Sequence, residues 1–243
     1  WKFANEWLEG DFNKDAVHSG NGAFSPNKKH FYFTRCEQNW RYQIICKIYV
    51  SQNVNNQWSE PVELPEEINM KKYSSTQPAV GTDSKTGCEV LYFVSNRPDG
   101  KGGMDIWYSI FQCKTQTWQA ARNCGNKINT AADEVTPFYQ NQEKTLYFSS
   151  DGWAGLGELD VFKSVGEMSK WTPAVNLGAP INSGFDDLYN SPNTLNSEGF
   201  LTSNRQPDKQ SSTCCDDIFS YKYVDKIYIG VEGLVYLLPN KIV

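Results

Sequence analysis

The stretch that decides the fold is LYFVSNRPDGKGGMDIW, residues 91–107. Its first part is rich in aromatic and β-branched residues, which favour strands. The segments Pro98-Asp99-Gly100 and Gly102-Gly103 are typical of turns and loops. A second apolar run, Asp105-Ile106-Trp107, starts 12 residues after Phe93. The stretch therefore predicts two antiparallel strands joined by a Gly-rich loop.

This pattern recurs along the chain. The aromatic strand appears four times at spacings of 60, 55 and 53 residues, anchored on Phe33, Phe93, Phe148 and Leu201. The motif Asp-(Ile/Val)-aromatic recurs at Asp160, 12 residues after Phe148, and at Asp217, 16 residues after Leu201. In the first unit Lys47 stands where the Asp is expected. A fixed internal period of this kind indicates a repeat architecture.

A third repeated feature is a Trp that precedes an Ile-Asn pair. The distance from Trp to Asn is 11 residues in each case, in the pairs Trp58 and Asn69, Trp118 and Asn129, Trp171 and Asn182. Each unit thus predicts four short strands and no helix. Such units bury their faces by stacking around an axis, so we expect an all-β fold, a β-propeller of four-stranded antiparallel blades.

The repeats divide the chain into units. They lie near residues 15–69, 70–129, 130–182 and 183–223, within a propeller that spans residues 1–225. The number of blades is left open by this pattern. The segment 226–243 is either the outer strand of the last blade or the start of a small regulatory-like β domain.

Composition excludes several classes of function. The net charge of −5 and the scattered basic residues make nucleic acid an unexpected partner. The longest apolar runs, such as residues 234–238, fall far short of the roughly 20 residues of a membrane helix. We therefore expect no direct membrane span.

On these motifs the chain resembles the PD40 repeats, WD40-like and TolB-related propellers of bacteroidete OmpA-family proteins. The resemblance rests on residues 91–98, 100–107, 146–150, 157–162 and 214–219. It implies a place in a PorE-like type IX secretion complex at the periplasmic face of the outer membrane, with other cell-envelope proteins as partners. Peptidoglycan binding would belong to a domain that this sequence does not contain.

The repeated polar residues are expected to have structural roles. Because each recurs at one repeat position, we interpret them as hydrogen-bonding groups that fix turns: Asp105, Asp160, Asp217, Asn69, Asn129 and Asn182. Acidic pairs such as Asp186-Asp187 have no EF-hand spacing, so we expect no metal. Catalytic motifs are also not found in the sequence, and we predict no enzymatic activity and no cofactor.

Seven cysteines suggest disulfides. Cys36 with Cys46, and Cys113 with Cys124, flank strand connections and could each close a hairpin, and Cys214-Cys215 is a vicinal pair. Cys88 would then remain unpaired. Free buried thiols and, with less support, zinc are the alternatives.

Binding is expected on the loops of one propeller face, because loops on a rigid scaffold carry most recognition. The candidate residues there are Arg97, Asp99, Lys101, Trp153, Leu156 and Arg205. Trp153 stands out, because glycines flank it and exposed Trp is favoured at interfaces, and packing under its own loop is the alternative. Our first hypothesis is a non-catalytic protein-interaction scaffold, and the alternative is a carbohydrate-binding or glycoside-processing propeller.

Overall fold

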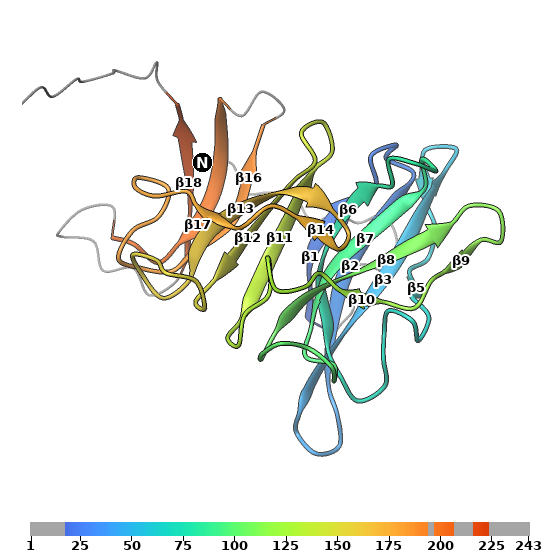
Figure 1. The fold of residues 1–243 in the computed structure, drawn as a ribbon. Helices are drawn as coiled ribbons and strands as arrows, with labels where there is room; N and C mark the ends of the chain where they lie inside the picture. Colours follow the sequence, from blue (N-terminus) through green and yellow to red (C-terminus); the bar gives the residue numbers. More distant parts are fainter. Residues whose placement is uncertain (1–17, 194–196, 207–215, 224–243) are drawn as a thin grey trace, which may run out of the picture.

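The computed structural model describes residues 18–193, 197–206 and 216–223, and it places four antiparallel sheets side by side as the blades of a β-propeller (Figure 1). All regular structure in these ranges is β-strand, apart from turns and bends. The predicted fold class is confirmed, and the described residues form four blades.

Each blade is built from strands that are consecutive in the sequence. Blade 1 contains β1 (His18–Phe24), β2 (His30–Gln38), β3 (Ile44–Val54), β4 (Gln57–Trp58) and β5 (Val62–Glu63). Blade 2 contains β6 (Ser75–Thr82), β7 (Glu89–Ser95), β8 (Asp105–Gln112), β9 (Thr117–Trp118) and β10 (Arg122–Asn123). Blade 3 contains β11 (Glu134–Gln140), β12 (Thr145–Ser150), β13 (Asp160–Glu167), β14 (Lys170–Trp171) and β15 (Val175–Asn176). Blade 4 contains β16 (Asp187–Pro192), β17 (Glu198–Ser203) and β18 (Asp217–Lys222).

Each blade runs outward from its first strand. In blades 1 to 3 the outer strand is split into two short pieces that both pair with the third strand. The first piece carries the repeated Trp, as predicted. Blade 4 has three strands within the described residues. The segment 226–243 and the pair Cys214-Cys215 lie outside the described residues, so the predictions about them stay predictions.

The blades are held together by the alternating faces of their second strands. In β7, Leu91 and Phe93 pack in the core between blades 1 and 2, whereas Tyr92 and Val94 pack in the core between blades 2 and 3. The repeated Trp crosses the same interfaces: the ring centroid of Trp118 lies 6.0 Å from that of Tyr32 in the preceding blade. Both odd and even positions of the second strand therefore need apolar residues, because each blade is covered on both sides.

Candidate functional site

The first strands of the four blades share an irregularity at the propeller axis. In each, the pairing with the second strand slips at a β-bulge, between Gly20 and Ala23 in β1 and at the matching places in β6, β11 and β16. The bulged residues have left-handed backbone angles, with φ of 51° to 52°: Asn21, Gln77, Thr136 and Tyr189. Bulges redirect side chains and are frequent next to binding sites.

Left-handed backbone is unfavourable for these residue types. Thr136 is β-branched and Tyr189 is bulky, so each is a conformational outlier that its surroundings must stabilise. Hydrogen bonds between blades do this. The backbone N–H of Thr136 donates to Oε1 of Gln77 over 2.7 Å, and Nε2 of Gln77 donates to the hydroxyl of Tyr189 over 3.3 Å. The backbone N–H of Gln77 donates in turn to Oγ1 of Thr34 over 3.0 Å.

A pocket of about 450 Å³ opens at this ring of bulges. Its volume falls within the usual range for small-molecule sites. All four blades contribute to its wall, which contains these residues: Asn21, Gly22, Ala23, Phe24, Pro26, Gln77, Pro78, Ala79, Val80, Thr136, Pro137, Phe138, Tyr139, Asn141, Tyr189 and Ser191. We call this cavity the axial pocket.

The axial pocket combines aromatic surface with neutral hydrogen-bonding groups. Phe24 is 48% exposed and Tyr189 is 38% exposed, so both rings are accessible. Burial raises the pKa of Tyr189, which keeps its hydroxyl protonated at neutral pH. The described residues of the wall include amides and hydroxyls but no Asp, Glu, His, Lys or Arg. Such a surface suits a neutral, hydroxyl-rich ligand.

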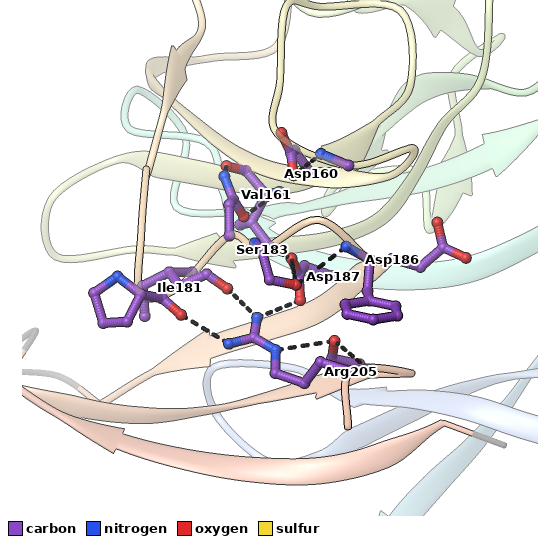
Figure 2. A network of polar contacts seen from close by, with 12 residues as sticks. Asp160, Val161, Ile181, Ser183, Asp186, Asp187 and Arg205 are labelled. Atoms are coloured by element: carbon purple, nitrogen blue, oxygen red, sulfur yellow. Dashed lines mark hydrogen bonds and ion pairs between the residues drawn. The ribbon is translucent and has the colours of Figure 1, made fainter. Parts of the chain in front are cut away.

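Two carboxylates begin first strands and are fully buried. Oε1 of Glu134 accepts from the hydroxyls of Thr130 and Ser150, at 2.6 and 2.8 Å. Asp187 accepts from Ser183 and forms an ion pair with Arg205 (Figure 2). Burial raises the pKa of Glu134. Both carboxylates therefore have a structural role: each binds a residue of the segment that connects its blade to the preceding blade.

One structural role is shared by Arg97, Trp153 and Arg205: each donates a hydrogen bond to the carbonyl of the Ile that precedes the repeated Asn. The Arg97 guanidinium donates to the carbonyl of Ile68, and the Trp153 indole N–H donates to the carbonyl of Ile128 over 2.9 Å. Figure 2 shows the guanidinium of Arg205 making the corresponding bond to Ile181. Trp153 also packs against the core between blades 2 and 3. Its side chain thus locks an interblade connection instead of standing free on the surface.

The other predicted loop residues lie in two different loops and at the start of β18. Asp99, Lys101 and Leu156 are exposed in the Gly-rich loops of blades 2 and 3. Each Gly-rich loop is held by the Asp that begins the following strand. The backbone N–H of Lys101 donates to Asp105, and that of Leu156 donates to Asp160. Asp217 is exposed at the start of β18.

The repeated Asn side chain makes three hydrogen bonds in each of blades 1 to 3, and two of the three are the same in every case. Oδ1 of Asn69 accepts from the N–H of Ile48, and its Nδ2 donates to the carbonyl of Ile48, both at 2.9 Å. Asn129 bonds in this way to Ile106, and Asn182 to Val161. The third bond joins each Asn to the outer strand region, at Leu64, Asn123 and Asn176 respectively. These bonds attach the loop that follows the outer strand to the third strand of the same blade.

The disulfides differ in part from the prediction. Cys36 and Cys46 form a bond, as the sequence suggests. Cys113 bonds to Cys88 instead of Cys124, so the predicted Cys113 to Cys124 pair and the unpaired Cys88 are both wrong. The reason is that Cys124 is turned into the core, where it packs with Ile106 and Ile128 as a buried thiol.

The described residues hold no group of three or more His, Cys, Asp or Glu side chains arranged to bind a metal ion. In this part of the chain no helix is long and apolar enough to cross a membrane.

Comparisons with known proteins place the fold. The sequence matches no protein family and no curated protein. Among solved structures, a xylan β-1,4-xylosidase from Bacillus halodurans C-125 has a TM-score of 0.53 at 14% identity, over 90% of this chain and 44% of that one. The fold resembles that of glycoside hydrolases. A GH43_12 protein from a capybara gut metagenome also has a TM-score of 0.53, at 13% identity, over 88% of this chain and 42% of that one. The chain thus spans less than half of either protein.

These matches correct two expectations. The first hypothesis, a non-catalytic protein-interaction scaffold of a secretion complex, is contradicted, because the structures matched over most of this chain are a xylan β-1,4-xylosidase and a GH43_12 protein. The prediction that the chain has no enzymatic activity is contradicted on the same grounds.

The axial ring was missed at the level of sequence. One signal for it exists in blades 2 and 3, where Gln77-Pro78 and Thr136-Pro137 place a proline inside a first strand. Proline within a strand is confined to edges and bulges, so these pairs could have indicated the bulge. In blades 1 and 4 the equivalent pairs are Asn21-Gly22 and Tyr189-Asn190, which share no residue type with them.

Proposed function

We propose that this chain is a carbohydrate-active propeller whose axial pocket binds a neutral saccharide. The observation that carries the proposal is the ring of bulged residues, which brings amide, hydroxyl and aromatic groups from all four blades to one cavity. Sugar hydroxyls are both donors and acceptors, and the side chains of Gln77, Tyr189 and Asn21 offer both kinds of partner.

The rigidity of the ring supports this function. Because neighbouring blades hydrogen-bond to Gln77 and Thr136, the ligand would not have to order these groups when it binds. The fold likeness to a xylan β-1,4-xylosidase makes β-1,4-xylo-oligosaccharides the first ligands to test.

The test is a calorimetric titration of the protein with xylotetraose, compared with the Gln77→Ala variant. We expect the substitution to weaken binding roughly tenfold, because it removes one or two hydrogen bonds worth about 1 kcal/mol each. Gln116→Ala is the matched control, since Gln116 is also left-handed, with φ of 57°, but is exposed and lies outside the axial pocket. A wild-type protein that binds no neutral oligosaccharide, or an affinity unchanged by Gln77→Ala, would contradict the proposal.

The same preparations should be assayed for release of reducing sugar. Glycosidases use a pair of carboxylates on either side of the scissile bond. The described wall of the axial pocket contains none, so a hydrolytic reaction there would need carboxylates from elsewhere. Release of sugar that is lost in Gln77→Ala would assign processing, and binding without release would assign recognition.

The resemblance to PD40 repeats and the periplasmic location stay predictions, and the sugar-binding proposal does not depend on either.

A further inference from the structure

Blade 1 differs from the other blades in the connection between its second and third strands. Strands β2 and β3 pair from His30 with Gln52 to Gln38 with Ile44, whereas β7 and β8 pair only as far as Ser95 with Asp105. The extra pairs replace the Gly-rich loop of the other blades. The result is a hairpin that reaches past the neighbouring loops, drawn in blue in Figure 1.

This hairpin is rigid at both its stem and its tip. The disulfide between Cys36 and Cys46 joins opposite positions in the stem. At the tip, Oδ1 of Asn39 accepts from the backbone N–H groups of Arg41 and Gln43, at 2.8 and 3.0 Å. The backbone N–H of Asn39 donates to the carbonyl of Gln43 over 2.9 Å, which closes the turn.

The tip presents large aromatic side chains to solvent. Trp40 is 82% exposed and Tyr42 is 83% exposed. The guanidinium carbon of Arg41 lies 4.5 Å from the Trp40 ring centroid, and a cation over one face helps to hold the indole in place. Rigid, exposed Trp and Tyr residues supply contact area at little cost in conformational entropy, and this is typical of recognition surfaces.

A polar hollow of about 270 Å³ runs along the hairpin from its stem to Asn39 at the start of the tip. Its walls include the side chains of Arg35, Glu37, Gln38, Asn39, Lys47 and Glu63. Arg35 is only 5% exposed and its guanidinium carbon lies 5.0 Å from the Tyr49 ring centroid, so this donor group is firmly placed. Two acidic and two basic residues line the hollow, so the wall has no net charge that would select a strongly charged ligand.

We infer that this hairpin and its hollow form a second carbohydrate-binding element, which holds a polysaccharide chain outside the axial pocket. Exposed aromatic rings at the tip and a cluster of donors and acceptors along the hairpin together match the C–H faces and hydroxyls of a sugar chain. The inference rests on the proposed function, because it takes the ligand class from the axial pocket.

The two sites are independent by geometry. The axial pocket includes Pro26, in the turn between β1 and β2, and therefore lies toward the beginning of β2. The aromatic tip follows the end of β2. A short oligosaccharide would therefore report on binding to the axial pocket. A polysaccharide has many sugar units, so the hairpin can bind some of them independently of the axial pocket.

The experiment measures retention of the full chain on insoluble xylan and, separately, its affinity for soluble xylotetraose. We expect the double variant Trp40→Ala, Tyr42→Ala to lose at least fivefold in retention and to bind xylotetraose like the wild type. Trp40→Phe should lose less, because an aromatic face remains. Tyr223→Ala is the matched control, since Tyr223 is 50% exposed and lies in blade 4.

Each outcome decides a separate question. Retention that is unchanged in the double variant, or reduced equally in Tyr223→Ala, overturns the hairpin site and leaves the axial site standing. Wild-type protein that binds xylotetraose but not xylan also overturns the hairpin site and leaves the axial site standing. Tip-dependent binding to phosphatidylglycerol vesicles without retention on xylan overturns it in favour of a membrane contact. If the wild type binds neither sugar, the proposed function fails and the inference fails with it.

Discussion

At the scale of single residues, the repeated Asn shows how a side chain can hydrogen-bond to a strand in the way that a neighbouring strand would. Asn129 is 2% exposed and satisfies both polar groups of the Ile106 backbone, at 2.9 Å each. A buried backbone group without a partner costs about 1–3 kcal/mol. One amide side chain at each repeat therefore fixes the path from the outer strand to the next blade.

Replacing Asn129 by Ala should lower the free energy of unfolding by about 2 kcal/mol, because the N–H of Ile106 loses its partner in a dry environment, whereas the Ile106 carbonyl keeps the bond from the N–H of Cys124. Chemical denaturation followed by fluorescence measures this. Asn126→Ala is the control, since Asn126 lies in the same loop and is exposed. Equal stability of the two variants would show that Asn129 is dispensable.

Glu134 predicts a pH dependence. Burial raises its pKa above the ordinary value of 4.5, so the folded state binds this proton more tightly than the unfolded state does. The free energy of unfolding therefore falls as pH rises from about 4.5 through the pKa in the folded protein.

Glu134→Gln removes this titration. The stability of the wild type relative to the variant should therefore be greater near pH 4.5 than at pH 7, as measured by urea unfolding at several pH values. A difference that stays constant, or grows with pH, would show that the carboxyl group is not shifted in this direction.

At the scale of elements, the disulfide between Cys88 and Cys113 connects the beginning of β7 with the end of β8. Spacing along the chain favoured a hairpin partner for Cys113, but the register of the β7 and β8 ladder brings Cys88 to it. Spacing cannot report which side of a strand a thiol is on. Cys124 is enclosed by the core, and burial raises the pKa of its thiol, so it stays protonated and unreactive.

Peptide mapping without reduction should recover Cys88 linked to Cys113 and Cys36 linked to Cys46. Iodoacetamide should label Cys124 only after denaturation, because the thiol is inaccessible in the folded state. Recovery of a Cys113 to Cys124 peptide, or labelling of Cys124 in the native protein, would be evidence against this arrangement.

At the scale of the whole molecule, blade architecture was predictable, whereas the axial pocket was not. The repeats in residues 91–107 and their equivalents report strand packing directly, because the same contacts recur in every blade. The axial ring uses a different residue in each blade, and only backbone geometry unites Asn21, Gln77, Thr136 and Tyr189. Similarly, Trp153 looked exceptional because its blade uses an indole where two others use a guanidinium.

The most direct test of the central claim is a crystal structure of the protein grown with xylotetraose. The account predicts a sugar unit in the axial pocket, within hydrogen-bonding distance of Gln77 and Tyr189 and in contact with Phe24. An empty axial pocket beside oligosaccharide bound elsewhere on the propeller would contradict it.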